Sequence, residues 1–212
     1  MNTLKHIIFD YGNVLLDIDL SLTMEALKKL NLQEFNPKDI YPDNRGIFLE
    51  LELGKVTQDD LFAYLRSLST QNPTDNELLD AWCKLLLPYD YSRFEMVAKL
   101  RKAGYRCHIL SNTNKPHHDF FEPLFNRENP FNKDLKQMFD KVFYSDEMGL
   151  RKPDRPIYEM VQQELGNPEP GSILFIDDNL PNLTEPTNLG WNTIHLTAQM
   201  NLEDELRKTI QF

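Results

Sequence analysis

The chain has 212 residues, which is enough for one sizeable domain or for a core with a smaller domain inserted in it. Its formal net charge of -10 argues against nucleic acid and against an anionic membrane surface as main partners. The two cysteines, Cys83 and Cys107, form neither a zinc spacing nor a disulfide framework, and no apolar run approaches the length of a membrane span. We therefore expect a cytoplasmic protein without a signal peptide.

The first predicted element is a short buried strand that leads into an aspartate. Ile7 to Phe9 form an apolar run that is too short for a helix, and Asp10 follows at once, ahead of a turn signal at Gly12 and Asn13. Ligands of open α/β sheets bind at the carboxyl ends of strands. A carboxylate at such a position can act as a nucleophile and form an aspartyl-phosphate, although an ordinary turn aspartate is the alternative.

The stretch between Asp17 and about Pro88 has no strand-like run and predicts a group of helices. Asp19 or Ser21 can cap the first of them, and Thr74 or Asp75 the last. A set of helices inserted directly after the first strand indicates a separate small domain, which we place at 17–88. The helices are predicted over 22–30, 47–53, 57–68 and 78–87, with a connector at 36–42.

After Pro88 the pattern changes to strands that alternate with helices. This alternation predicts βαβ units and a parallel sheet, so we assign 1–16 and 89–212 to one core domain. The strands are predicted over 106–110, 141–145, 172–176 and 192–196, and the helices over 91–103, 120–125 and 156–165, with a surface loop at 126–133.

Polar side chains follow the predicted strands where each strand ends. Ser111 and Asn112 follow the second strand, and Asp177 and Asp178 end the fourth. Lys152 lies in the loop after the third strand. Because the carboxyl ends of parallel strands share one edge of the sheet, we expect these groups to meet Asp10. A nucleophilic carboxylate, hydroxyl and amide donors and a fixed cation together suit phosphoryl transfer.

The three aspartates Asp10, Asp177 and Asp178 would repel one another without a cation. Hard carboxylate oxygens of this kind select Mg²⁺, which bridges readily to a substrate phosphate. Taken singly, each stretch has an ordinary alternative: a turn at Ser111 and Asn112, a solvated loop at 151–153, and a helix cap at 177–179. Their ordered joint occurrence at strand ends favours the functional interpretation.

With these strand-end residues in this order, the chain resembles the haloacid dehalogenase superfamily of phosphatases. Four stretches resemble its ordered motifs, and the stretch 52–56 resembles a recurring part of its helical caps. The resemblance implies a Rossmann-like three-layer α/β core with a parallel sheet and an inserted α-helical cap of the C1 type. Within the superfamily the chain is most similar to the bacterial α-D-glucose-1-phosphate phosphatase branch. The four stretches are 9–14, 110–112, 149–154 and 175–179.

The resemblance also implies an activity and a set of roles. The protein is expected to be a Mg²⁺-dependent phosphomonoester hydrolase that acts on a small phosphorylated metabolite, such as glucose 1-phosphate. We expect it to be a monomer or a weak homodimer. Asp10 would attack phosphorus, and Lys152 would hold the phosphoryl group. The remaining implied roles are phosphate binding by Ser111, Asn112 and His117, and metal binding by Asp10, the Gly12 carbonyl, Asp178 and also Asp177.

One position departs from the family pattern. Most of these phosphatases carry a second aspartate two residues after the nucleophile, where it works as a general acid and base, but here that residue is Gly12. His117, Asp17 and a metal-activated water are candidates for this role, and a solvated loop residue is the alternative for His117. Two other functions stay open. A dehalogenase that attacks carbon would not need the metal, so Asp177 and Asp178 argue against it, and Gly12 is the reason to consider a non-catalytic binding or regulatory protein.

Overall fold

The computed structural model describes residues 4–32, 36–40 and 45–212. In these ranges one parallel sheet has the strand order β3-β2-β1-β4-β5. β1 lies at the centre, so the chain moves outward through β2 and β3 and then returns to the other side of β1, which creates a switch point between β1 and β4. The strands are β1 (His6–Phe9), β2 (Arg106–Ser111), β3 (Lys141–Tyr144), β4 (Ile173–Asp177) and β5 (Asn192–His195).

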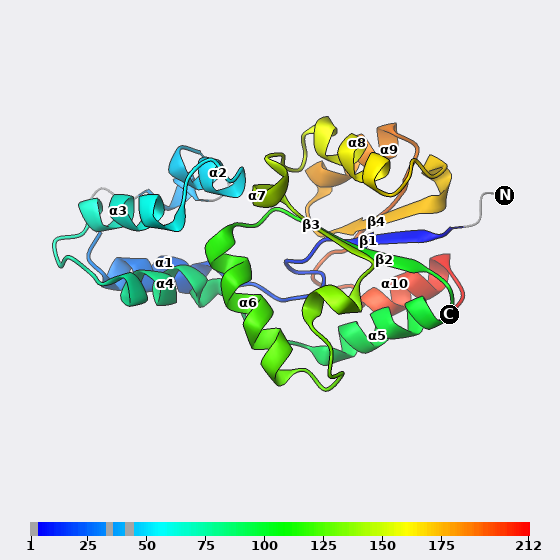
Figure 1. The fold of residues 1–212 in the computed structure, drawn as a ribbon, viewed down its shortest axis with the longest axis horizontal. Helices are drawn as coiled ribbons and strands as arrows, with labels where there is room; N and C mark the ends of the chain where they lie inside the picture. The colour runs from blue at the N-terminus through cyan, green and yellow to red at the C-terminus, as the bar shows by residue number, and fades with distance from the viewer. Residues whose placement is uncertain (1–3, 33–35, 41–44) are drawn as a thin grey trace.

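Helices cover both faces of the sheet, which confirms the predicted three-layer α/β core (Figure 1). Alternating residues of β1 face opposite layers: Ile7 and Phe9 pack in one apolar cluster and Ile8 in the other. This explains why the strands are continuous apolar runs. One layer contains α5 (Tyr91–Lys102), α6 (Lys115–Glu128) and α10 (Leu202–Thr209), and the other α8 (Arg155–Glu164) and α9 (Thr184–Asn188).

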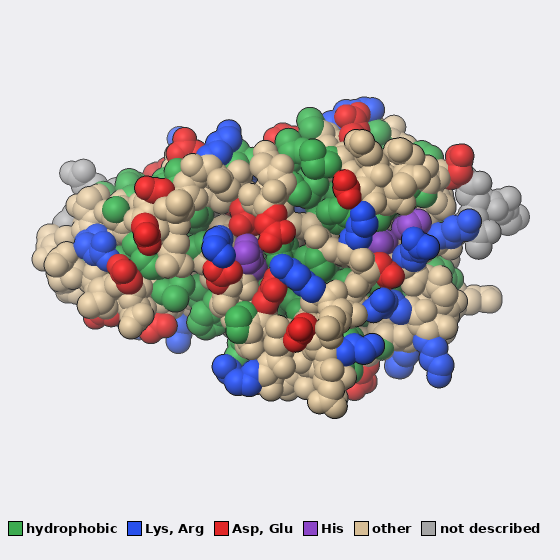
Figure 2. Space-filling view, viewed as in Figure 1, with side chains coloured by type: hydrophobic (Ala, Val, Ile, Leu, Met, Phe, Trp, Pro, Cys, Tyr) green, Lys and Arg blue, Asp and Glu red, His purple; other side chains and the backbone are tan. Residues whose placement is uncertain are grey.

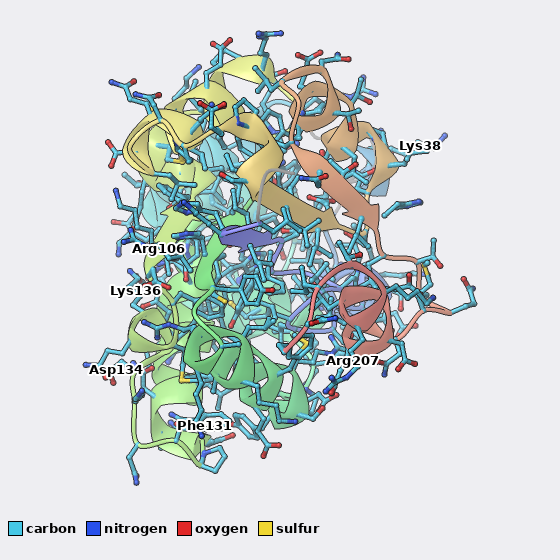
Figure 3. All side chains as sticks on the ribbon, turned by 90° about the vertical axis from the view of Figure 1, so that its right-hand side faces the viewer. Lys38, Arg106, Phe131, Asp134, Lys136 and Arg207 are labelled. Carbon is cyan, nitrogen blue, oxygen red and sulfur yellow. The ribbon has the colours of Figure 1, made fainter. Side chains whose placement is uncertain are left out.

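The two ends of the strands, amino and carboxyl, form two edges of the sheet that face different surroundings. Figure 3 looks at the edge where the strands begin, with Arg106, the first residue of β2, at this end of the molecule. The opposite edge, where the strands end, faces the helical insertion (Figure 1). The strand-end residues singled out in the sequence therefore lie between the sheet and the insertion.

The insertion packs around an apolar cluster of its own, which includes Leu27, Phe48, Leu61 and Trp82. Its helix starts follow the predicted caps: Asp19 accepts a hydrogen bond from the backbone N–H of Ser21, and threonines form capping boxes in two further helices. The domain boundaries at 16/17 and 88/89 stay a prediction. The helices are α1 (Leu20–Lys29), α2 (Ile47–Glu52), α3 (Gln58–Leu68) and α4 (Asp75–Trp82), followed by a 3₁₀ turn, η2 (Cys83–Leu85).

The two chain segments that join the insertion to the core run side by side. The backbone N–H of Asp19 donates to the carbonyl of Leu85 at 2.8 Å, and that of Leu87 donates to the carbonyl of Asp17 at 3.1 Å. Ile18 and Leu86 complete this short antiparallel contact. The entry and exit of the insertion are therefore tied together at one place.

The element boundaries differ from the predictions mainly where helices are short or begin with polar residues. The helix predicted over 120–125 is the longer α6, which begins at Lys115 because Asn114 caps it and Pro116 fits its first turn. The predicted 78–87 helix ends at Trp82 and continues as η2. Three short helices were not predicted: α7 (Ser145–Met148), α9 and α10. Part of the predicted 36–42 connector forms η1 (Pro37–Asp39), and only its positions 41 and 42 lie outside the described residues.

In the described part of the chain, no helix combines the length and the apolar character needed to cross a bilayer.

Gly54 lies where the insertion approaches the core closely. It follows the last turn of α2 with φ +64°, and a Cβ atom built on it would overlap the carbonyl oxygen of Asp146 in α7. Glycine is therefore required at position 54 for two reasons: it adopts the positive φ, and it leaves room for the carbonyl of Asp146.

We predict that Gly54→Ala destabilises the protein more than the same change at Gly166. Gly166 follows α8 in an equivalent position with φ +87°, but a Cβ atom placed there would meet no heavy atom of the described residues within 4 Å. Both variants carry the backbone strain, and Gly54→Ala adds overpacking, so the free energies of unfolding should differ by about 1–3 kcal/mol in urea titrations. Equal losses would contradict the close approach.

Two buried histidines touch across the central strands. His6 Nδ1 lies 3.2 Å from His108 Nε2, and their rings stack with centroids 5.4 Å apart. His108 is 2% exposed, and burial, reinforced by His6, lowers the pKa of its imidazole to about 3. The folded protein therefore keeps His108 neutral in the pH range where the unfolded chain binds a proton.

We predict that His108→Leu makes the stability less sensitive to mild acid. Because the folded pKa lies below the unfolded value of 6.5, the stabilisation is complete above pH 6.5 and is lost as the pH falls toward 3. At pH 5 His108 alone should cost about 2 kcal/mol relative to pH 7.5. Urea midpoints at the two pH values measure the effect. An equal drop in wild type and variant would refute it, since other titrating groups are common to both.

Candidate active site

The carboxyl edge of the sheet opens into a cavity of about 520 Å³ between core and insertion. On the face seen in Figure 2, acidic side chains and a histidine gather over the junction of these two parts. Of the residues singled out in the sequence, all but Asp177 and Asp17 line this cavity. Those that do are Asp10, Gly12, Ser111, Asn112, His117, Lys152 and Asp178.

Lys152 lies between two buried carboxylates. Its Nζ is 2.8 Å from Asp10 Oδ1 and 2.7 Å from Asp177 Oδ2, and its side chain is 1% exposed. Although burial by itself would lower the pKa of Lys152, attraction to Asp10 and Asp177 raises it, so the ammonium stays charged. The predicted cation therefore has a fixed position beside the predicted nucleophile.

Asp10 follows β1 and is held from two sides. Its backbone N–H donates to the carbonyl of Ile176 at 2.8 Å, and its Oδ1 accepts the N–H of Tyr11 at 2.6 Å. Burial raises the pKa of its carboxyl to about 7, and Lys152 opposes this rise while Asp177 adds to it. Burial thus outweighs the lysine, which on its own would favour the ionised form.

The neighbouring aspartates have different surroundings. Asp177 is fully buried, and its oxygens accept hydrogen bonds from Lys152, from the backbone N–H of Asn179 at 2.8 Å and from Asn182 Nδ2 at 3.0 and 3.1 Å. Asp178 is half-buried, faces the cavity, and accepts a hydrogen bond from Asn13 Nδ2 at 2.9 Å. Burial, with the charge of Asp177 added to it, raises the pKa of Asp178.

The donor set fits a hard divalent cation. Asp10, Asp177 and Asp178 each offer a carboxylate oxygen, and these oxygens lie within 4.8 Å of one another. Three clustered carboxylates beside one ammonium leave an excess of negative charge, and oxygen ligands suit Mg²⁺. Since the oxygens of Asp177 already accept several hydrogen bonds, Asp178 is the better placed of the pair to bind a metal.

Asn112 has a contact that the sequence did not indicate. Its Nδ2 donates to the carbonyl of Lys152 at 2.8 Å, and its Oδ1 accepts the N–H of Lys152 at 2.9 Å. The side chain therefore holds the Lys152 backbone against the end of β2. Ser111, the last residue of β2, is buried and lines the cavity next to it.

His117 lies at the start of α6, and both of its ring nitrogens have partners. Asn114 Nδ2 is 3.1 Å from Nδ1, and the carbonyl of Trp82 is 3.2 Å from Nε2. An amide donor at Nδ1 assigns the ring proton to Nε2, which donates to Trp82. Burial lowers the pKa of His117 to about 4, so the ring is neutral near pH 7. This geometry makes it a link to the insertion.

Asp17, the other side chain considered as general acid and base, lies outside this cavity, whereas Gly12 lies in its wall. Asp17 is an ion-pair partner of Arg93, at 2.8 Å, and lines a separate hollow. Gly12 does line the cavity, and a Cβ built on it would lie 3.3 Å from Ile18 Cδ1, the end of a flexible side chain.

The insertion supplies the rest of the cavity wall. Phe48, Trp82 and His117 form a parallel stack, with ring centroids 5.7 and 5.2 Å apart, that reaches from the insertion to α6. Glu52 of α2 pairs with Arg151 of the core, with Oε2 and Nε 3.1 Å apart. Glu52 and Arg151 belong to stretches that resembled family motifs, but nothing in the sequence paired them. Trp82 and Phe48 gave no signal beyond helical periodicity.

Comparisons with known proteins agree with this geometry. Residues 4–184 match the family of haloacid dehalogenase-like hydrolases. The chain is 31% identical over 191 residues to the D-ribitol-5-phosphate phosphatase of Bacteroides thetaiotaomicron, a match that covers 90% of each protein. It is 26% identical over 212 residues to a sesquiterpene phosphatase of Aspergillus oryzae, covering 98% of this chain and 97% of that protein.

The fold has a similar relative among solved structures. A haloacid dehalogenase family enzyme of Bacteroides thetaiotaomicron, crystallised as the wild-type protein with magnesium and inorganic phosphate, superposes with a TM-score of 0.84. The two chains are 26% identical, and the match covers 96% of this chain and all of that one.

Proposed function

Because the chain belongs to the haloacid dehalogenase-like hydrolase family and is a hydrolase of phosphoric monoesters, we propose that it uses Mg²⁺ to hydrolyse a small phosphorylated sugar or polyol. The observation that carries the proposal is the contact of Lys152 with Asp10 and Asp177 at the floor of the cavity. The glucose 1-phosphate branch expected from the sequence stays a prediction, since the relative of 31% identity is named for ribitol 5-phosphate.

In this proposal Asp10 Oδ2 is the attacking atom. Lys152 and the N–H of Tyr11 hold Oδ1, which fixes the plane of the carboxylate and directs the other oxygen toward the cavity. Oδ2 forms a bond to phosphorus as the bond from phosphorus to the leaving oxygen breaks, which gives an aspartyl-phosphate and an alkoxide that takes a proton from water to become the alcohol. Water then cleaves the acyl phosphate and regenerates Asp10.

The other predicted residues take supporting roles. Ser111 and Lys152 are assigned to the phosphoryl oxygens, and Asn112 to holding Lys152 in place. Asp10, Asp178 and the Gly12 carbonyl would hold Mg²⁺, with Asp177 positioned behind them. The cation, when bound, supplies charge that neutralises the phosphoryl oxygens and favours the ionised form of Asp10. His117 is assigned to anchoring the insertion through Trp82.

We predict that Asp10→Asn lowers hydrolysis of p-nitrophenyl phosphate by several orders of magnitude. The amide keeps the shape of the side chain but cannot attack phosphorus, and thermal unfolding should show that the variant folds. Asp59→Asn, on the exposed surface of α3, is the matched control. A variant within about tenfold of wild type, a barrier change of ~1.4 kcal/mol, would rule out the covalent mechanism.

The same assay tests the metal. EDTA should abolish turnover, Mg²⁺ should restore it, and Ca²⁺ should restore it poorly because it admits extra ligands and a looser geometry. Full activity after exhaustive chelation would refute the metal assignment.

We predict that Gly12 makes the protein prefer substrates with good leaving groups. No side chain at this position can protonate the leaving oxygen, and the anomeric oxygen of glucose 1-phosphate needs less protonation than the primary oxygen of glucose 6-phosphate. Wild type should therefore have the higher kcat/KM for the 1-phosphate. Gly12→Asp should narrow the ratio, whereas Gly12→Ala, which makes the same contact with Ile18, should not. A wild-type preference for the 6-phosphate would contradict the idea.

A further inference from the structure

The part of the cavity lining that the insertion supplies is mostly apolar, and an ion pair joins it to the core. Glu52 and Arg151 both line the cavity, and their side chains are 22% and 23% exposed. They come from opposite sides of the boundary, since Glu52 ends α2 of the insertion and Arg151 directly precedes Lys152. The apolar residues of this wall include Leu20, Ile40, Phe48, Trp82 and Leu85.

Other polar groups that line the cavity are engaged with the protein itself. Thr23 Oγ1 donates to the carbonyl of Trp82 and accepts the N–H of Leu85, both at 3.0 Å. Asn114 accepts from Trp82 Nε1 at 3.3 Å and also contacts His117. These groups fix the wall, and the Glu52–Arg151 pair adds two formal charges to the lining of the same cavity.

The position of the phosphate determines which part of the substrate lies next to Glu52 and Arg151. A phosphoryl group bound at Lys152 and Asp10 would leave the rest of the substrate in the cavity that Glu52 and Arg151 also line. A hydroxyl group can donate to the carboxylate of Glu52 and accept from the guanidinium of Arg151, replacing water without loss of hydrogen bonds. A hydrocarbon in the same place would remove water from both charges and return nothing.

We propose that the Glu52–Arg151 pair binds hydroxyl groups of the leaving alcohol and selects polyol phosphates against alkyl and isoprenoid phosphates. This inference rests on the proposed phosphatase function and names the residues that set its substrate class. It separates two substrate types that the phosphatase relatives represent, a polyol phosphate and a sesquiterpene compound.

The test uses two substrates that differ only in hydroxyl groups. Ribitol 5-phosphate and n-pentyl phosphate have the same number of carbons and the same primary phosphate. Wild type should favour the polyol in kcat/KM by at least about tenfold, the magnitude expected for hydrogen bonds to charged groups. Glu52→Gln should reduce this ratio by at least about tenfold, mainly through KM for the polyol. Glu159→Gln, which removes an exposed pair with Arg155 on α8, should keep the wild-type ratio.

A purely structural role of the pair, as a contact that holds the insertion on the core, predicts a different result. It would lower kcat/KM for both substrates by the same factor and leave their ratio unchanged, which would overturn the inference. A second variant, Arg151→Lys, keeps the cation but not the fork of donors and should reduce the ratio as well. If Glu52→Gln does not fold, two other measurements report the preference for the polyol. One is the kcat/KM ratio of Arg151→Lys, and the other is the inhibition of p-nitrophenyl phosphate hydrolysis by ribitol.

The controls separate this inference from the function on which it rests. Hydrolysis of p-nitrophenyl phosphate that requires Mg²⁺ and Asp10 establishes the phosphatase mechanism whatever the two C5 substrates show. If that reaction is absent, the proposed function and the inference both fail. If it is present and the kcat/KM of wild type for n-pentyl phosphate or farnesyl phosphate equals or exceeds its kcat/KM for ribitol 5-phosphate, only the inference fails.

Discussion

The candidate active site depends on one buried ammonium between two buried carboxylates. Lys152 Nζ lies 2.8 Å from Asp10 Oδ1 and 2.7 Å from Asp177 Oδ2, almost without solvent, where an unpaired charge would be costly. Each group therefore needs the others: the lysine stays charged because of the aspartates, and the aspartates come together because of the lysine. Asn112, which follows β2, forms two hydrogen bonds with the backbone of Lys152, and Asn182 donates a hydrogen bond to Asp177.

This arrangement explains why the strand order matters to the chemistry. β1 lies between β2 and β4, so the residues that follow these three strands converge on one point even though they are far apart in sequence. The switch between β1 and β4 leaves an opening at the edge of the sheet, and the loop that carries Lys152 reaches it from β3. Every group of the floor is thereby attached to a rigid strand or held by a residue that follows one.

The insertion completes the site with a different kind of contact. It is tied to the core by the stack of Trp82 on His117, by the ion pair of Glu52 with Arg151, and by the close approach of Gly54 to Asp146. These contacts lie around the cavity, and none of them involves the carboxylate of Asp10. Changes in the insertion can therefore alter which leaving group fits while the floor keeps its geometry.

The sequence alone determined the sheet, the inserted helices and the positions of Asp10, Ser111, Lys152, Asp177 and Asp178, because strand periodicity and strand-end residues are local signals. It also showed that Gly12 stands where most members of the resembled family carry a second aspartate. Only the tertiary structure decided which of these residues contact one another. The hydrogen bonds of Asn112 to the Lys152 backbone, the contact of Lys152 with Asp177 and the Glu52–Arg151 pair join residues far apart in the chain. Such pairings depend on how the elements pack, and no local pattern of residue types encodes them.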